Sequence, residues 1–167
     1  MADKAPLKLL CVTAHPDDEC FAFGGALMLA HKAGVETTVL CFTDGQAATN
    51  RGVAVSGEHL GEMRRREFLA SCKILDVTHA EILDYQDAQL EFADFSATAA
   101  RLVERIRRDK PDVVLTFGSE ISGAILSGSY RPISTFAWCA ATSQAALSKK
   151  GSPLNLASPW LPSITSR

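Results

Sequence analysis

The sequence predicts an α/β fold, an open and mostly parallel sheet with helices on both faces. Three observations lead to this fold class. Short apolar segments alternate along the chain with segments whose apolar residues recur at helical spacing. The apolar segments are nearly continuous, which is typical of parallel strands covered on both faces. The connections are short, as they are in repeated βαβ units.

The first βαβ unit lies near the N-terminus. Residues 7–13 are predicted to form the first central strand, because this run is almost entirely apolar. A helix is expected over residues 21–33, and Gly34 is suited to end it. The β-branched run over residues 35–43 then predicts a second strand parallel to the first.

Two further strand and helix pairs are predicted downstream. An amphipathic helix is expected over residues 60–75 and a strand over residues 79–83. A second helix is expected over residues 97–108, with Ser96 as its N-cap, and residues 112–117 form the fourth strand. The chain therefore predicts a doubly wound sheet, whose sites lie at the carboxyl ends of its strands.

The composition changes after Gly118. Residues 119–167 hold eleven serines, four basic residues and a single acidic one, Glu120. We therefore divide the chain into a core at residues 1–118 and a tail at residues 119–167. The tail is expected to be divergent or out of register, and poorly ordered.

Composition and charge exclude several classes of protein. A chain of 167 residues that is 47% hydrophobic and 22% charged is typical of a single globular domain. The net charge of −2 argues against binding to nucleic acid. No apolar run reaches the roughly 18 residues of a membrane span. Five cysteines without CxxC spacing indicate reduced thiols and a cytoplasmic location. Self-assembly into a homo-oligomer is left open.

The run His15-Pro16-Asp17-Asp18-Glu19 follows the first predicted strand and carries the chemistry. His15 and Asp18 are spaced so that both can bind one metal ion, which leaves Asp17 for proton transfer. An Asp pair at a helix start is also a common N-cap, so a purely structural role is the alternative. The loop at residues 45–57 is expected at the same sheet edge, either as a functional loop or as a tolerated insertion.

Five segments in order carry a family resemblance. They are AHPDDE (14–19), LxFTDG (40–45), GEMRRRE (61–67), DY (84–85) and PDVVLTFG (111–118). With these motifs the chain resembles the LmbE-like, or PIG-L, de-N-acetylase superfamily over about residues 5–118. The resemblance implies a Rossmann-like domain that uses a divalent metal, usually zinc. It also implies hydrolysis of N-acetyl groups on N-acetylglucosamine conjugates or related small-molecule amides.

The resemblance also implies roles for single residues. His15 and Asp18 look like metal ligands and Asp17 like the general base. Arg64 resembles the arginine that contacts the substrate in the family. Glu19 resembles a residue that orients the metal ligands from behind.

The sequence departs from the family after the fourth predicted strand. There the family has a Gly-His-Pro-Asp-His type segment, which supplies the third metal ligand and a histidine that assists the transition state. This chain instead reads SEISGAIL at residues 119–126. We therefore expect an incomplete metal site and an impaired activity.

Two explanations of this departure compete. In one, the chain has diverged, and Glu120 or a water completes the metal site. In the other, the tail is out of frame. Ala124-Ile125-Leu126 can be encoded as GCC-ATC-CTN, and reading from a G one base upstream gives codons for Gly-His-Pro.

Two other functions are kept as alternatives to a hydrolase. One is a catalytically silent module that keeps the pocket for binding. The other is a receiver-like signalling domain, in which Asp17 and Asp18 hold Mg²⁺ near a phosphoacceptor such as Asp84. Cys20, next to the motif, is expected to be a buried thiol. The remaining histidines are expected at the surface, although the position of His59 allows it to reach the site; they are His31, His59 and His79.

Overall fold

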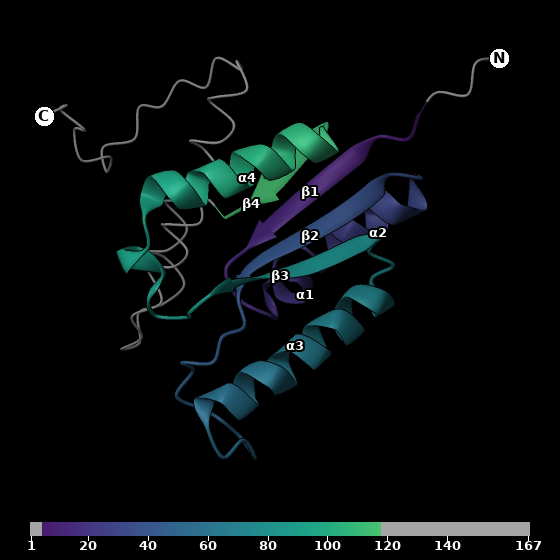
Figure 1. The fold of residues 1–167 in the computed structure, drawn as a ribbon. Coiled ribbons are helices and arrows are strands. Elements are labelled where there is room, and N and C mark those ends of the chain that lie inside the picture. The colour runs from purple at the N-terminus through teal and green to yellow at the C-terminus, as the bar shows by residue number, and fades with distance from the viewer. Residues whose placement is uncertain (1–4, 118–167) are drawn as a thin grey trace, which may run out of the picture.

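The structure is a computed structural model that describes residues 5–117 of the chain. These residues form a four-stranded sheet with helices on both sides (Figure 1). The α/β fold class predicted from the sequence is therefore confirmed. The predicted core at residues 1–118 covers the described part of the chain. The predicted tail at residues 119–167 lies outside it.

The described residues form four strands, four α-helices and a short 3-10 helix. In chain order they are β1 (Lys8–Thr13), α1 (Asp18–Phe21), α2 (Gly24–Lys32), β2 (Glu36–Thr43), α3 (Gly57–Ile74), β3 (His79–Tyr85), the 3-10 helix (Leu90–Phe92), α4 (Phe95–Asp109) and β4 (Val113–Thr116).

The sheet order is β3-β2-β1-β4, and each neighbouring pair of strands is parallel. β1 lies in the centre, where Cys11 is opposite Val39 of β2 and Leu115 of β4. Because all four strands run in the same direction, the loops that follow them lie at a single edge of the sheet. The residues after β1 and β4 are direct neighbours at this edge.

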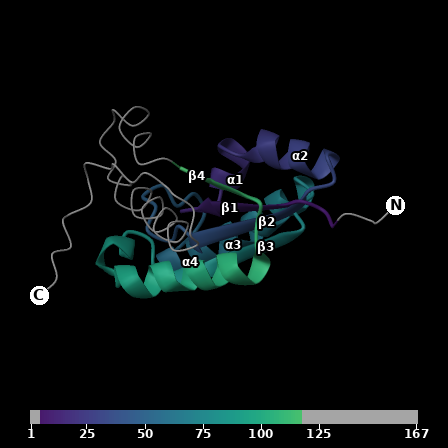
Figure 2. The ribbon, with the colours of Figure 1, turned by 90° about the horizontal axis from the view of Figure 1, so that it is seen from above.

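Alternate residues of the central strands form two cores, one on each face of the sheet. On one face Leu10 and Val12 pack with Leu102 and Ile106 of α4. On the other face Cys11 packs among residues of α2 and α3, namely Leu27, Phe68 and Cys72. Figure 2 shows α2 and α4 on opposite sides of the sheet. Burial on both faces explains why these strands read as continuous apolar runs.

Two details of the first helix differ from the sequence prediction. The helix expected over residues 21–33 is interrupted, since α1 ends at Phe21 and α2 begins at Gly24. Phe21, the last residue of α1, has 87% of its surface exposed. The prediction that Cys20 is buried is also wrong, because Cys20 is exposed.

The helix starts were also displaced by a few residues. α4 begins after Asp94, whose side chain accepts a hydrogen bond of 2.8 Å from the backbone N–H of Ala97. The predicted cap, Ser96, lies inside the helix. α3 begins after Ser56, whose hydroxyl accepts from the N–H of His59 at 3.1 Å. Both helices therefore start at residues with good capping side chains that apolar periodicity alone did not locate.

Candidate functional site

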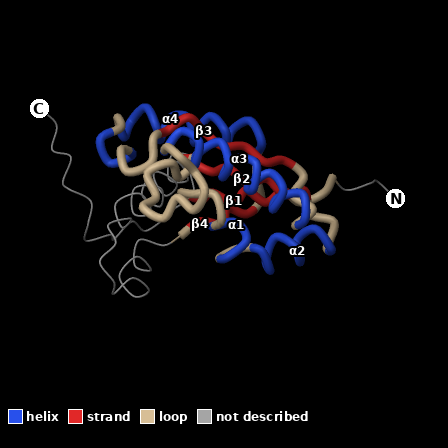
Figure 3. Tube along the Cα trace, turned by 90° about the horizontal axis from the view of Figure 1, so that it is seen from below, coloured by secondary structure: helices blue, strands red, loops and turns tan. Residues whose placement is uncertain are grey.

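The turn at residues 14–19 begins where β1 ends, at the edge of the sheet to which all strands run. Figure 3 shows the loops that follow the strands gathered at this end. The turn is fixed to β2 because the backbone N–H and the hydroxyl of Thr43 both donate to the carbonyl of Ala14, at 3.1 and 2.9 Å. The predicted site is therefore on rigid secondary structure.

Asp18 folds back over the turn. Its Oδ2 accepts hydrogen bonds from the backbone N–H groups of Ala14, at 3.1 Å, and of His15, at 2.9 Å. Burial raises the pKa of Asp18 to about 6, although these hydrogen bonds oppose the increase. A carboxylate in this position is held ready to bind a cation, which would compensate for its poor solvation.

The imidazole of His15 lies between two carboxylates. Its Nδ1 is 4.0 Å from Oδ2 of Asp18, and its Nε2 is 3.0 Å from Oδ1 of Asp87, which follows β3. Burial acts to raise the pKa of Asp87, but the hydrogen bond and the charge of His15 outweigh it and lower this pKa. The His15 and Asp87 side chains are both 12% exposed, so solvent screens the pair only weakly.

Asp17 has an unusual backbone conformation. Its φ of 103° is one that residues with a side chain rarely adopt, so the turn holds it under strain. The conformation is stabilised by Glu19, whose Oε2 accepts a hydrogen bond of 2.9 Å from the N–H of Asp17. Glu19 is fully buried, and its Oε1 has no hydrogen-bond partner among the described residues. Glu19 thus supports the backbone of the turn at Asp17.

Arg64 of α3 reaches over to this turn. Its Nη2 donates to Oδ2 of Asp17 at 2.8 Å and to the carbonyl of Pro16, while its Nη1 donates to the carbonyl of Gly45 at 3.2 Å. Burial raises the pKa of Asp17, whereas the charge of Arg64 lowers it, and the net pKa is raised. The Asp17 side chain is 51% exposed, so it is accessible from solvent.

The acidic side chains suit a divalent cation. The 4.0 Å between Nδ1 of His15 and Oδ2 of Asp18 is within about 4.2 Å, the sum of a Zn–N and a Zn–O bond. These two donors are therefore close enough to reach a single zinc ion, and a tetrahedral site would bring them to about 3.4 Å apart. No group of three or more His, Cys, Asp or Glu side chains able to hold a metal occurs among residues 5–117. The segment expected to supply the third ligand, residues 119–126, lies outside these residues.

The loop that follows β2 lies next to the turn at residues 14–19. Asp44 accepts a hydrogen bond of 3.2 Å from Nε of Arg65, and a Cβ on Gly61 would lie 2.8 Å from the same carboxylate. His59 is turned toward its own loop, where Nδ1 accepts from the N–H of Val55 at 3.4 Å. Asp44 and Arg65 thus connect the loop to α3.

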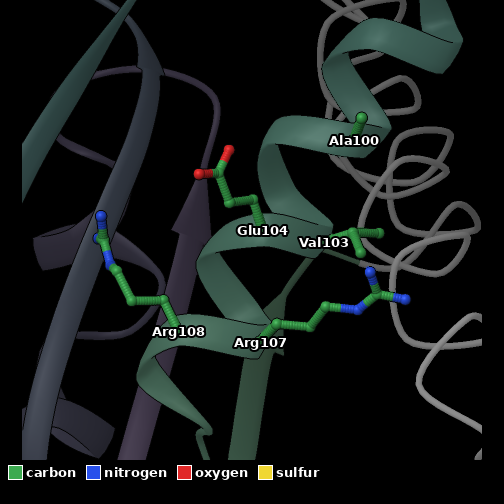
Figure 4. A pocket seen from close by; sticks show the side chains of 5 residues that line it. All are labelled: Ala100, Val103, Glu104, Arg107 and Arg108. Carbon is green, nitrogen blue, oxygen red and sulfur yellow. The ribbon is translucent and has the colours of Figure 1, made fainter.

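A cavity of about 590 Å³ lies elsewhere, against α4, as Figure 4 shows. It is lined by Ala100, Val103, Glu104, Arg107 and Arg108. The last turns of α4 precede β4, so this cavity is near the edge where the strands begin. It is therefore separate from the candidate site.

Asp87 is the site residue that the sequence analysis missed. The family motif ends at Asp84-Tyr85, although Asp87 is the next acidic residue and comes two residues after the end of β3. Acidic residues at the ends of parallel strands converge at one edge, and this rule would have found it. The structure brings together all the predicted site residues, namely His15, Asp17, Asp18, Glu19 and Arg64, and adds Asp87 to them.

A parallel α/β sheet with a histidine and acidic residues at the end of its central strand is typical of metal-dependent hydrolases. The model of one such family, described as GlcNAc-PI de-N-acetylase (PIG-L), matches residues 10–124. The chain belongs to this family. The resemblance predicted from the five motifs is confirmed.

Among its relatives is a probable N-acetyl-α-D-glucosaminyl L-malate deacetylase 2 of Bacillus cereus. The two are 32% identical over 114 residues, which make up 67% of this chain and 52% of the relative. The N,N'-diacetylchitobiose deacetylase of Pyrococcus horikoshii, solved with its inhibitor MPG, has a similar structure. Its TM-score is 0.70 at 26% identity, covering 84% of this chain and 49% of that one.

A second similar structure has a different activity. It is GalB, the 4-carboxy-2-hydroxymuconate hydratase of Pseudomonas putida KT2440, with a TM-score of 0.68 at 23% identity over 84% of this chain and 55% of that one. This likeness concerns the fold alone. The chain spans about half the length of the relatives it matches. None of the helices among the described residues is long and apolar enough to cross a membrane.

Proposed function

We propose that the chain is a divalent-metal hydrolase, with zinc as the ion, that removes acetyl groups from an N-acetylated sugar or sugar conjugate. One observation carries the proposal. In a chain of the GlcNAc-PI de-N-acetylase family, His15 and Asp18 lie within range of one ion, and Asp17 is held next to them by Arg64. A cytoplasmic location, expected from the sequence, is part of the same proposal.

The side chains divide the reaction between them. His15 and Asp18 hold the ion, which when bound polarises the amide carbonyl and makes water more acidic. Asp17 accepts a proton from the water that attacks the carbonyl carbon. The C–N bond then breaks, the nitrogen takes up a proton from Asp17, and acetate and the amine leave. The raised pKa of Asp17 suits a group that takes up a proton and returns it.

Arg64 has a second part in this scheme. Its hydrogen bond fixes Oδ2 of Asp17, which leaves Oδ1 to accept the proton of the attacking water. Arg64 is also the residue proposed to contact the sugar, since its side chain lies at the border of the turn and the loop after β2. We expect the substrate to enter between these two segments.

The test measures acetate released from N-acetylglucosamine and N,N'-diacetylchitobiose by the purified chain with added zinc. The D17N variant keeps the shape of the side chain but removes the base, so we expect at least a 100-fold loss of rate. D84N is the matched control, because the Asp84 side chain is 80% exposed and pairs with Arg101 instead. Equal rates for D17N and the unaltered chain would contradict the assignment of the base.

A catalytically silent binding module is the second candidate function. It is favoured by the absence of a complete metal-binding group among residues 5–117. Sugar binding without acetate release, measured by calorimetry on the same samples, would support it. The receiver-like alternative has no such support, because Asp84 is at the surface and bound to Arg101.

A further inference from the structure

We propose that Asp87 is a positioning residue, which fixes the imidazole of His15 with its proton on Nε2 so that Nδ1 is the metal-binding nitrogen. The inference rests on the proposed function for its metal. It depends on the position of one carboxylate, which the sequence motifs did not include.

The first step concerns the proton on the imidazole. Nε2 of His15 is 3.0 Å from Oδ1 of Asp87, and an ionised carboxylate can only accept a hydrogen bond. At neutral pH an aspartate carboxylate is ordinarily ionised. Nε2 must therefore carry the proton, and a neutral imidazole then leaves Nδ1 as the nitrogen with a lone pair.

The second step concerns the direction in which Nδ1 of His15 faces. Nδ1 is the nitrogen on the side of Asp18, at 4.0 Å from its Oδ2. With Nε2 protonated, the lone pair of His15 and the carboxylate of Asp18 face the same space, where one ion can bind both. With the proton on Nδ1 instead, that nitrogen could not coordinate a metal.

The third step is the rigidity of Asp87 itself. Its Oδ1 accepts a hydrogen bond of 2.8 Å from the N–H of Ala88, and the N–H of Ala47 also donates to the carboxylate. Its own N–H donates to Oε1 of Gln46 at 3.2 Å. Asp87 is therefore held by the loops after β2 and β3, and it transmits their position to His15. A carboxylate behind a metal-binding histidine also makes the imidazole a stronger donor.

The test is NMR of the chain labelled with ¹⁵N-histidine, without metal, at a pH where the imidazole is neutral. The signals of His15 are assigned by their loss in H15Q. We expect protonated Nε2, unprotonated Nδ1 and an Nε2 proton that exchanges slowly with water. In D87A this proton should exchange rapidly and both tautomers should be populated. D84A, three residues away in β3, should match the unaltered chain.

D87N serves as a second variant in case D87A does not fold, because an amide oxygen still accepts from Ala88 and Ala47. It too should lose the single tautomer, since an amide can donate to Nε2 as well as accept from it. A proton on Nδ1 in the unaltered chain, or an unchanged His15 in both variants of Asp87, would overturn the proposal.

Zinc affinity, measured by competition with a chelator, gives a second readout. We expect the affinity to fall about 10- to 100-fold in D87A and to be unchanged in D84A. An unaltered affinity in D87A would overturn the link to the metal. A chain that binds no zinc at all would overturn the proposed function, whereas the tautomer measurement would still decide the role of Asp87. Failure of the two proposals can therefore be distinguished.

Discussion

The side chain of Arg64 is the connection between α3 and the turn that carries Asp17. It donates to a carboxylate and to two backbone carbonyls, and this pattern requires the planar fork of a guanidinium. Lysine would keep the charge but could not reach all three acceptors. The geometry of Asp17 therefore depends on the shape of Arg64 as well as its charge.

We predict that R64K lowers the kcat/KM of acetate release by about 10- to 100-fold, as expected for the loss of one or two hydrogen bonds to a charged group. The variant should still fold, because lysine keeps the positive charge and most of the aliphatic stem of Arg64. R66K is the matched control, since Arg66 is two residues away and its side chain is 73% exposed. Similar kinetics for R64K and R66K would show that charge alone is sufficient.

Gly45 is the residue against which Arg64 packs. Its φ is +67°, and a Cβ built on it would lie only 2.1 Å from Nη1 of Arg64. We predict that G45A displaces the guanidinium and lowers both the melting temperature and the rate of acetate release. G52A is the control that measures the effect of backbone strain without a steric clash. Gly52 has a φ of +54°, and nothing lies close to its Cβ position.

The two glycine variants are compared by thermal unfolding and by activity. G52A should lower the free energy of unfolding by about 1–2 kcal/mol, because alanine is strained in the left-handed backbone conformation. It should leave the activity unchanged. G45A should lower the free energy of unfolding by more than G52A does, and it should also slow the release of acetate. If the two variants unfold alike and retain full activity, Gly45 is required only for its turn.

The N-terminus of α4 gives a prediction about a whole element. Asp94 caps this helix, whereas the sequence favoured Ser96. D94A should lower the free energy of unfolding by about 1 kcal/mol, the usual cost of losing an N-cap. S96A should be nearly neutral or slightly stabilising, because Ser96 is an exposed residue of the first turn. Urea denaturation of both variants tests this prediction. A larger loss of stability in S96A than in D94A would show that α4 begins after Ser96, as the sequence predicted.

Strands were easier to predict than helix ends. β1 and β2 were found to within one residue because burial on both faces leaves a continuous apolar run. The helix predicted over residues 21–33 was wrong at its start, since the acidic residues at Asp18 and Glu19 already begin α1. Phe21 lies at the break between α1 and α2 and is exposed.

The site could be predicted from the sequence only where its residues are contiguous. His15, Asp17 and Asp18 lie in one turn, and the family motif adds Arg64. Asp87 comes from a different strand, and its contact with His15 spans 72 positions of sequence. Such a pair depends on sheet order and on the loop after β3, which no local pattern contains. The same applies to the hydrogen bond that the backbone N–H of Asp87 donates to Gln46.

At the scale of the whole molecule, the sheet order predicts where the missing ligand should be. β4 pairs with β1, with Thr116 opposite Val12, so β4 ends beside the end of β1, which leads into the turn that carries His15. A histidine shortly after residue 117 would therefore lie at the same edge as His15 and Asp18. The family model matches as far as residue 124, yet the sequence has no histidine after His79.

The coding DNA tests whether a shift of reading frame removed that histidine. We predict that Gly123 to Leu126 are encoded as GGG-GCC-ATC-CTN, because only then does the shifted frame read Gly-His-Pro after β4. Restoring this frame should supply a third ligand and strengthen zinc binding, measured by chelator competition against the chain as it stands. Other codons at these positions would exclude the frame shift. The chain would then be a diverged member of its family, and a two-donor site would be expected to bind zinc weakly.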